Sequence, residues 1–163
     1  MLTRLLITIH VIAGLLFLGP VTVAGSLFPR YARQALDHLP DRTQAYGAVR
    51  LLYRITTGYA VAAVTVPVFG LSAASEKHAF GQAWLQVSIG LVAAAAALLG
   101  LIVLPGQRRV ITELDCPQGE GSRSSLTPDL RRLLTRLSVS TGLFALTWVS
   151  VAALMIAKPG GTH

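Results

Sequence analysis

Four long runs of the chain contain no Asp, Glu, Lys or Arg, and charged residues gather between them. The runs cover residues 5–29, 55–75, 78–107 and 137–157. Each reaches the roughly 20 residues that a helix needs to cross about 30 Å of hydrocarbon. In hydrocarbon every backbone N–H and C=O must be satisfied within its own segment. The pattern therefore predicts an all-α polytopic membrane protein, an antiparallel bundle of four transmembrane helices.

In a single domain that covers residues 1–163, we place the four spans at about residues 5–28, 51–74, 82–105 and 135–157. The second helix is expected to begin near Arg42, before it enters the membrane. Pro20 and Pro67 lie inside the first and second spans. Because a proline removes one backbone hydrogen bond from a helix, each predicts a bend.

The composition agrees with a membrane location. Of the 163 residues, 53% are hydrophobic and 13% are charged, and the formal net charge is +7. Such a basic chain can bind nucleic acid, but here the arginines lie at the ends of the spans, where they set topology and meet anionic lipid headgroups. We therefore expect a lipid bilayer around this protein, and no nucleic acid as a partner.

Lysine and arginine are distributed unequally among the connections. The first connection, residues 30–50, carries four, and the third, residues 106–136, carries six. The second connection and each terminus carry one. Because positively charged loops stay in the cytoplasm, the first and third connections should face inward in a bacterial inner (plasma) membrane. Both termini are then expected outside the cytoplasm.

Candidate catalytic groups are missing from the apolar runs. None of them contains Asp or Glu, whereas proton-coupled transport usually uses an intramembrane carboxylate. The chain has no HExxH, CxxC, Walker or GxSxG motif. Its single cysteine, Cys116, has no His or Cys near it in the sequence. We therefore expect no catalytic residues, and the pattern favours a protein that is not an enzyme.

His10 is the one histidine that a predicted span encloses. An ionisable residue inside a span is a functional-site hypothesis, and imidazole ligates haem iron, copper and zinc. His10 is therefore a candidate cofactor-binding and metal-binding residue, for haem or copper. A cleft near the outer surface would combine it with Trp148 and Ser150. The alternative is a neutral histidine that bonds a neighbouring helix or water, since no second histidine lies in a span.

Five arginines flank the cytoplasmic ends of the second and fourth spans. They provide either a cradle for an anionic headgroup or partner protein, or only the charges that set topology. These candidate lipid-binding or partner-binding residues are Arg50, Arg54, Arg131, Arg132 and Arg136.

Three stretches together resemble a known family. They are IHVIAGLLFLGP at 9–20, LIVLPGQRRV at 101–110 and LMIAKPG at 154–160. They resemble a family of small four-helix bacterial integral membrane proteins known only as a domain of unknown function. That family is itself distantly similar to the membrane region of copper-resistance D proteins. The resemblance implies a four-helix bundle with an early histidine in the first helix, matched here by His10, and it implies no established activity.

These observations favour a small non-catalytic accessory or subunit protein that packs within a larger membrane assembly. Its partners would be other membrane-protein subunits or further copies of itself in a homo-oligomer. The alternative is a haem- or copper-handling membrane protein in which His10 is the ligand. A small-solute or lipid transporter would instead need a continuous cavity between the spans.

Overall fold

The computed structural model describes residues 2–36, 42–76, 81–115 and 127–157. Within these ranges the elements, in chain order, are α1 (Leu2–Leu36), α2 (Arg42–Ala63), α3 (Thr65–Glu76), α4 (Ala83–Ala97), the π-helical segment η2 (Leu98–Val103), α5 (Leu104–Asp115) and α6 (Pro128–Ala157). They make four helical stretches that are long and apolar enough to cross a membrane. The predicted all-α class with four apolar helices is confirmed.

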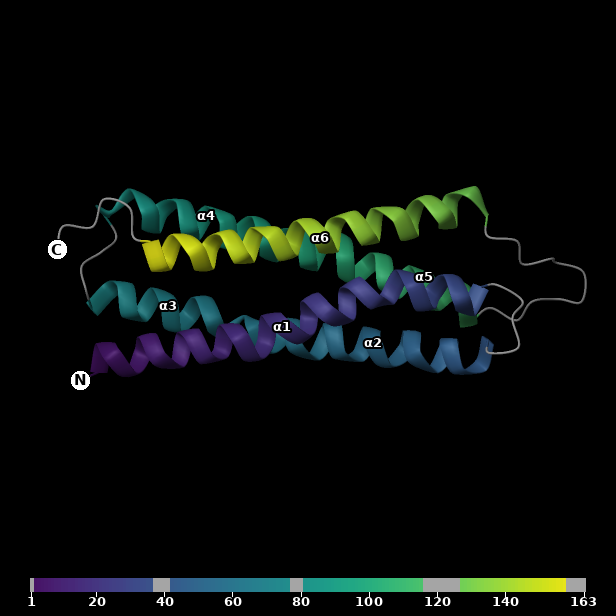
Figure 1. The fold of residues 1–163 in the computed structure, drawn as a ribbon, viewed down its shortest axis with the longest axis horizontal. Helices are drawn as coiled ribbons and strands as arrows, with labels where there is room; N and C mark the ends of the chain where they lie inside the picture. The colour runs from purple at the N-terminus through teal and green to yellow at the C-terminus, as the bar shows by residue number, and fades with distance from the viewer. Residues whose placement is uncertain (1, 37–41, 77–80, 116–126, 158–163) are drawn as a thin grey trace, which may run out of the picture.

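The four stretches run antiparallel along the length of the molecule (Figure 1). The start of α1, the end of α3, the start of α4 and the end of α6 lie together at one end, which we call the terminal end. The opposite end, where α1 and α5 finish and α2 and α6 begin, carries Arg30, Arg50, Arg108 and Arg136. We call it the basic end. The predicted start of the second helix near Arg42 is confirmed.

The second stretch is interrupted where Pro67 predicts a bend. A proline at 67 has no N–H to offer to the carbonyl of Ala63, and its ring crowds that carbonyl. The helix accordingly stops at Ala63 and restarts at Thr65. At the break the Val64 N–H bonds the Val61 carbonyl at 3.2 Å, and the Thr65 hydroxyl donates to the Ala62 carbonyl at 2.7 Å. By contrast, α1 continues through Pro20 and Pro29.

The third stretch contains a π-helical segment just before Pro105. Pro105 cannot donate to the carbonyl of Leu101, and wider i→i+5 turns are one way for a helix to accommodate a local irregularity. The Leu104 N–H bonds the carbonyl of Leu99, five residues earlier. The helix then continues as α5 to Asp115.

The buried core is unequal along the bundle. The largest cluster lies at the basic end and joins all four stretches. Its buried members are Ala24, Phe28, Ala32, Ala35, Leu36, Ala45, Val49, Leu52, Val110, Leu134 and Leu137. A central cluster contains Val21, Ala95, Leu99, Val103 and Phe144. The cluster at the terminal end has two buried members, Ala74 and Leu85, with Trp84 against them.

The helices α1 and α6 meet closely at the middle of the bundle. A Cβ atom on Gly25 would lie 2.8 Å from the Thr141 Cγ2 atom, so only glycine fits there without a shift. Two turns further along α6, the Trp148 indole N–H donates to the Thr22 hydroxyl at 3.0 Å. That hydroxyl in turn donates to the Leu18 carbonyl at 2.9 Å. Small residues and interhelical hydrogen bonds of this kind hold helices together in a bilayer.

Candidate functional site

His10 lies on α1 and packs against α3 at the terminal end. Its Nδ1 atom is 2.7 Å from the carbonyl oxygen of Val66, and the side chain is partly buried. Opposite the ring lies Gly70, where a Cβ atom would come within 2.8 Å of the His10 Cε1 atom. The glycine thus forms a notch that admits the imidazole to the surface of α3.

The hydrogen bond to Val66 determines which ring nitrogen of His10 carries the proton. A backbone carbonyl only accepts hydrogen bonds, so Nδ1 must be the donor. In the neutral imidazole Nε2 is then unprotonated and has a free lone pair. Histidines that ligate metals commonly donate their other ring N–H to a backbone carbonyl in this way. The arrangement therefore suits either a hydrogen bond between helices or a single metal ligand.

The predicted cleft of His10, Trp148 and Ser150 is not formed. The Trp148 indole bonds Thr22, which is twelve residues beyond His10 on α1, or about 18 Å along the helix. The Ser150 hydroxyl donates to its own helix, at the Leu146 carbonyl, and its side chain is exposed. His10 therefore pairs with α3 and not with α6, because its neighbour is determined by helix packing that no sequence pattern encodes.

Arg50 belongs to a polar contact between α2 and α5 at the basic end. Its Nη2 atom lies 3.3 Å from the Asp115 Oδ2 atom, and its guanidinium lies 5.3 Å from the centre of the Tyr46 ring. The Tyr46 hydroxyl also donates to the Asp115 carboxylate. This hydrogen bond, more than the partial desolvation of the phenol, raises the pKa of Tyr46 above its ordinary value, although the nearby Arg50 opposes the shift.

The other predicted arginines lie on the surface. Arg132 approaches Asp129 at 3.7 Å, but their side chains are 77% and 90% exposed, and such pairs contribute little to stability. Arg131 and Arg136 are exposed, and within the described residues neither forms an ion pair. Arg54 is also exposed and differs from them in its surroundings, because it lies at one end of a groove.

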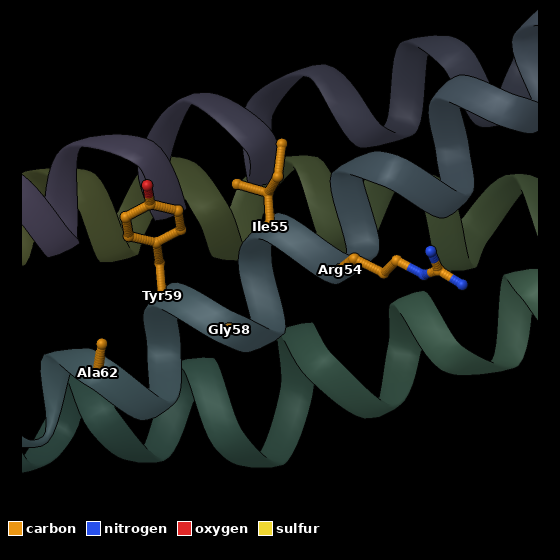
Figure 2. A pocket seen from close by; sticks show the side chains of 5 residues that line it. All are labelled: Arg54, Ile55, Gly58, Tyr59 and Ala62. Carbon is orange, nitrogen blue, oxygen red and sulfur yellow. The ribbon is translucent and has the colours of Figure 1, made fainter.

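The groove runs along α2 and has a volume of about 400 Å³. Figure 2 shows its lining, which comes from one helix. The lining residues are Arg54, Ile55, Gly58, Tyr59 and Ala62. The Tyr59 ring is held against Phe17 of α1, with the ring centres 6.4 Å apart. The groove is open to the surroundings and mostly apolar, so it suits an extended apolar group.

Several notable side chains could not have been found from sequence. Gln107 is 1% exposed, and its Oε1 atom has no hydrogen-bond partner among the described residues, as is true of the Thr141 hydroxyl. Gln107 directly precedes two arginines, which suggests a surface position. Val66 and Gly70 carry no chemical signal, and their role depends on where α1 lies.

Metal-binding groups do not gather within residues 2–36, 42–76, 81–115 and 127–157. No group of three or more His, Cys, Asp or Glu side chains that could hold a metal ion occurs there. The single cysteine, Cys116, lies outside these ranges, as do His38, His78 and His163. His10 therefore offers one ligand by itself.

Comparison with known proteins identifies the family. Residues 4–159 match the family model described as predicted integral membrane protein (DUF2269). The matched region includes all four apolar helices. No curated protein and no solved structure matches the chain. The distant similarity to copper-resistance D proteins stays a prediction.

Proposed function

We propose that this chain, which belongs to the DUF2269 family of predicted integral membrane proteins, is a non-catalytic accessory or subunit protein within a larger membrane assembly. The observation that supports this function is the unequal core. At the basic end one cluster joins all four stretches through large side chains such as Phe28 and Leu134. At the terminal end the described buried apolar residues are Ala13, Val66, Ala73, Ala74, Leu85 and Val151.

Half of those terminal-end residues are alanines, so the helices there share little packing area. Helix association in a bilayer depends on van der Waals packing and interhelical hydrogen bonds, because lipid tails are as apolar as the helices. A transmembrane helix from another subunit, or from a second copy of this chain, would supply the packing that this half lacks. Exposed apolar side chains on α3 and α4 at this end, such as Leu71 and Val87, are available for that contact.

The same proposal includes an orientation. The arginines of the basic end would face the cytoplasm, because positively charged connections are retained there. The terminal end would face outward from a bacterial inner membrane, as the charge distribution predicts for both chain termini. Partner contact would therefore be made in the outer half of the bilayer.

Photo-crosslinking in native membranes tests the accessory function. A crosslinking amino acid placed at Leu71 or Val87 should give adducts with a protein, either another subunit or a second copy of the chain. The matched control is Val139 on α6, which is also exposed and apolar but lies near the well-packed basic end. Adducts with lipid alone at all three positions would contradict the accessory function.

A second candidate function follows from the ring orientation of His10. With Nδ1 donating to Val66, Nε2 is free to ligate haem iron or copper. A haem brings its own equatorial ligands and takes a histidine as an axial ligand, so one protein ligand is compatible with it. Copper sites use several protein ligands, and the described residues do not cluster in that way. A copper site would therefore need ligands from a partner.

Spectroscopy of the purified protein tests this second candidate. Protein extracted in mild detergent should show a Soret band, and His10→Ala should abolish it. The variant Thr8→Ala, two residues before His10 on α1, removes a hydroxyl that bonds only the Arg4 carbonyl, and it should leave the spectrum unchanged. Colourless wild-type protein without bound copper would rule out the candidate.

A further inference from the structure

The groove on α2 has a regular internal geometry. Arg54, Gly58 and Ala62 are spaced four residues apart, so they form one stripe along the helix. Ile55 and Tyr59 form the neighbouring stripe and make a ridge beside it (Figure 2). From Arg54 to Ala62 the stripe is about 12 Å long at 1.5 Å per residue. Gly58 leaves the floor of the groove open, because no other side chain lies within 4 Å of the place where a Cβ atom would be.

The groove is charged at one end and apolar along the rest. The Arg54 side chain extends away from Gly58 toward the basic end (Figure 2), as expected of a long cation that reaches for the headgroup region. It has no ion pair within the described parts of the chain. Each of the other three stretches also has its innermost arginine at the basic end, namely Arg30, Arg108 and Arg136. Arg54 is the one of these four that lines the groove.

We propose that the groove binds one anionic phospholipid of the cytoplasmic leaflet. An acyl chain lies over Gly58 and Ala62, parallel to α2, and the phosphate group meets the Arg54 guanidinium. The groove axis follows the helix and hence the direction of lipid chains in a bilayer. The charge at its end complements an anionic headgroup, and arginine binds phosphate through paired N–H donors. An apolar transmembrane helix in the same place would leave Arg54 without an anion.

Native mass spectrometry with added phospholipid tests this site. The protein in detergent is titrated with phosphatidylglycerol and, separately, with zwitterionic phosphatidylcholine. We expect one phosphatidylglycerol to bind more tightly than any phosphatidylcholine. Because one arginine near an anionic surface contributes about a fivefold factor in affinity, Arg54→Gln should weaken phosphatidylglycerol binding about fivefold. Gly58→Leu should weaken binding of both lipids, because the leucine side chain would fill the groove where the acyl chain lies.

Each variant has a matched control elsewhere on the surface. Arg136→Gln removes another exposed innermost arginine, outside the groove. Gly142→Leu fills another exposed glycine position, on α6, where a Cβ atom also meets nothing within 4 Å. Both controls should bind phosphatidylglycerol as the wild type does. Equal losses in Arg54→Gln and Arg136→Gln, or equal affinity for the two lipids, would overturn the proposal.

A separate crosslinking experiment distinguishes a lipid from a protein as the occupant of the groove. A photo-crosslinking amino acid at Ala62, in native membranes, should give an adduct with a phospholipid. An adduct with a protein would assign the groove to a partner helix and overturn the lipid assignment. This result is independent of the crosslinks from Leu71 and Val87, which are on other helices at the terminal end.

Discussion

His10 is the residue for which the structure adds most. A histidine in a span predicts either a cofactor ligand or a hydrogen bond between helices. The 2.7 Å contact between the His10 Nδ1 atom and the Val66 carbonyl is the predicted hydrogen bond. This hydrogen bond also leaves the Nε2 atom free to ligate a cofactor. Gly70 makes the hydrogen bond possible, because a Cβ atom at that position would lie 2.8 Å from the His10 Cε1 atom and push the ring away from α3.

Gly70→Ala tests this contact. Helix propensity alone would stabilise the protein by about 1 kcal/mol, but the new Cβ atom would displace the imidazole from Val66. We therefore expect Gly70→Ala to be less stable than Gly90→Ala by about 1–2 kcal/mol in thermal or denaturant unfolding. Gly90 is the control because a Cβ atom there meets nothing within 4 Å.

Combining Gly70→Ala with His10→Ala isolates the interaction between the two positions. Once the ring is absent, Gly70→Ala should gain the same helix propensity as Gly90→Ala. A Gly70→Ala penalty that persists without the imidazole would show that another contact is responsible.

At the scale of elements, prolines and polar contacts determine how the stretches are shaped and joined. Pro67 breaks the second stretch at Val64, whereas Pro105 follows a π-helical segment without ending its helix. The contact of Tyr46 and Arg50 with Asp115 joins α2 to α5. Helical spacing places Tyr46 and Arg50 on one face, but nothing in the sequence indicates that Asp115 lies opposite them.

The Tyr46 contact should make stability depend on pH in the alkaline range. The neutral phenol donates to the Asp115 carboxylate, and folding raises the pKa of Tyr46 above its ordinary value of 10.0. Its contribution is therefore fully present below pH 10.0 and is lost as the pH rises through the raised pKa. Wild-type protein should be more stable than Tyr46→Phe at neutral pH, and the difference should shrink in strong alkali.

Thermal unfolding in detergent at several pH values measures this difference, and tyrosinate absorbance follows the titration. Tyr53→Phe is the control on the same helix, because within the described residues the Tyr53 hydroxyl forms no hydrogen bond. A Tyr46→Phe variant as stable as wild-type protein at neutral pH would contradict the assigned role.

At the scale of the whole molecule, the proposed function rests on the difference in packing between the basic end and the terminal end. The basic end is held by a cluster from all four stretches, while the described buried apolar residues of the terminal end are few and half of them are alanines. This difference supports an accessory protein completed by a partner in the outer half of the bilayer. It also separates the two proposed contacts, since the lipid groove on α2 begins at Arg54, toward the basic end.

The sequence by itself determined the all-α class, the four apolar helices, the start of α2 at Arg42 and the break near Pro67. These features depend on local composition: hydrocarbon requires internally satisfied backbone groups, and proline lacks an N–H. Only the tertiary structure decided that His10 meets Val66, that Asp115 joins Tyr46, and that Arg54 alone among the predicted arginines lines a groove. Those features depend on which helices are neighbours and at what rotation, and apolar helices in a bilayer can associate through many similar faces.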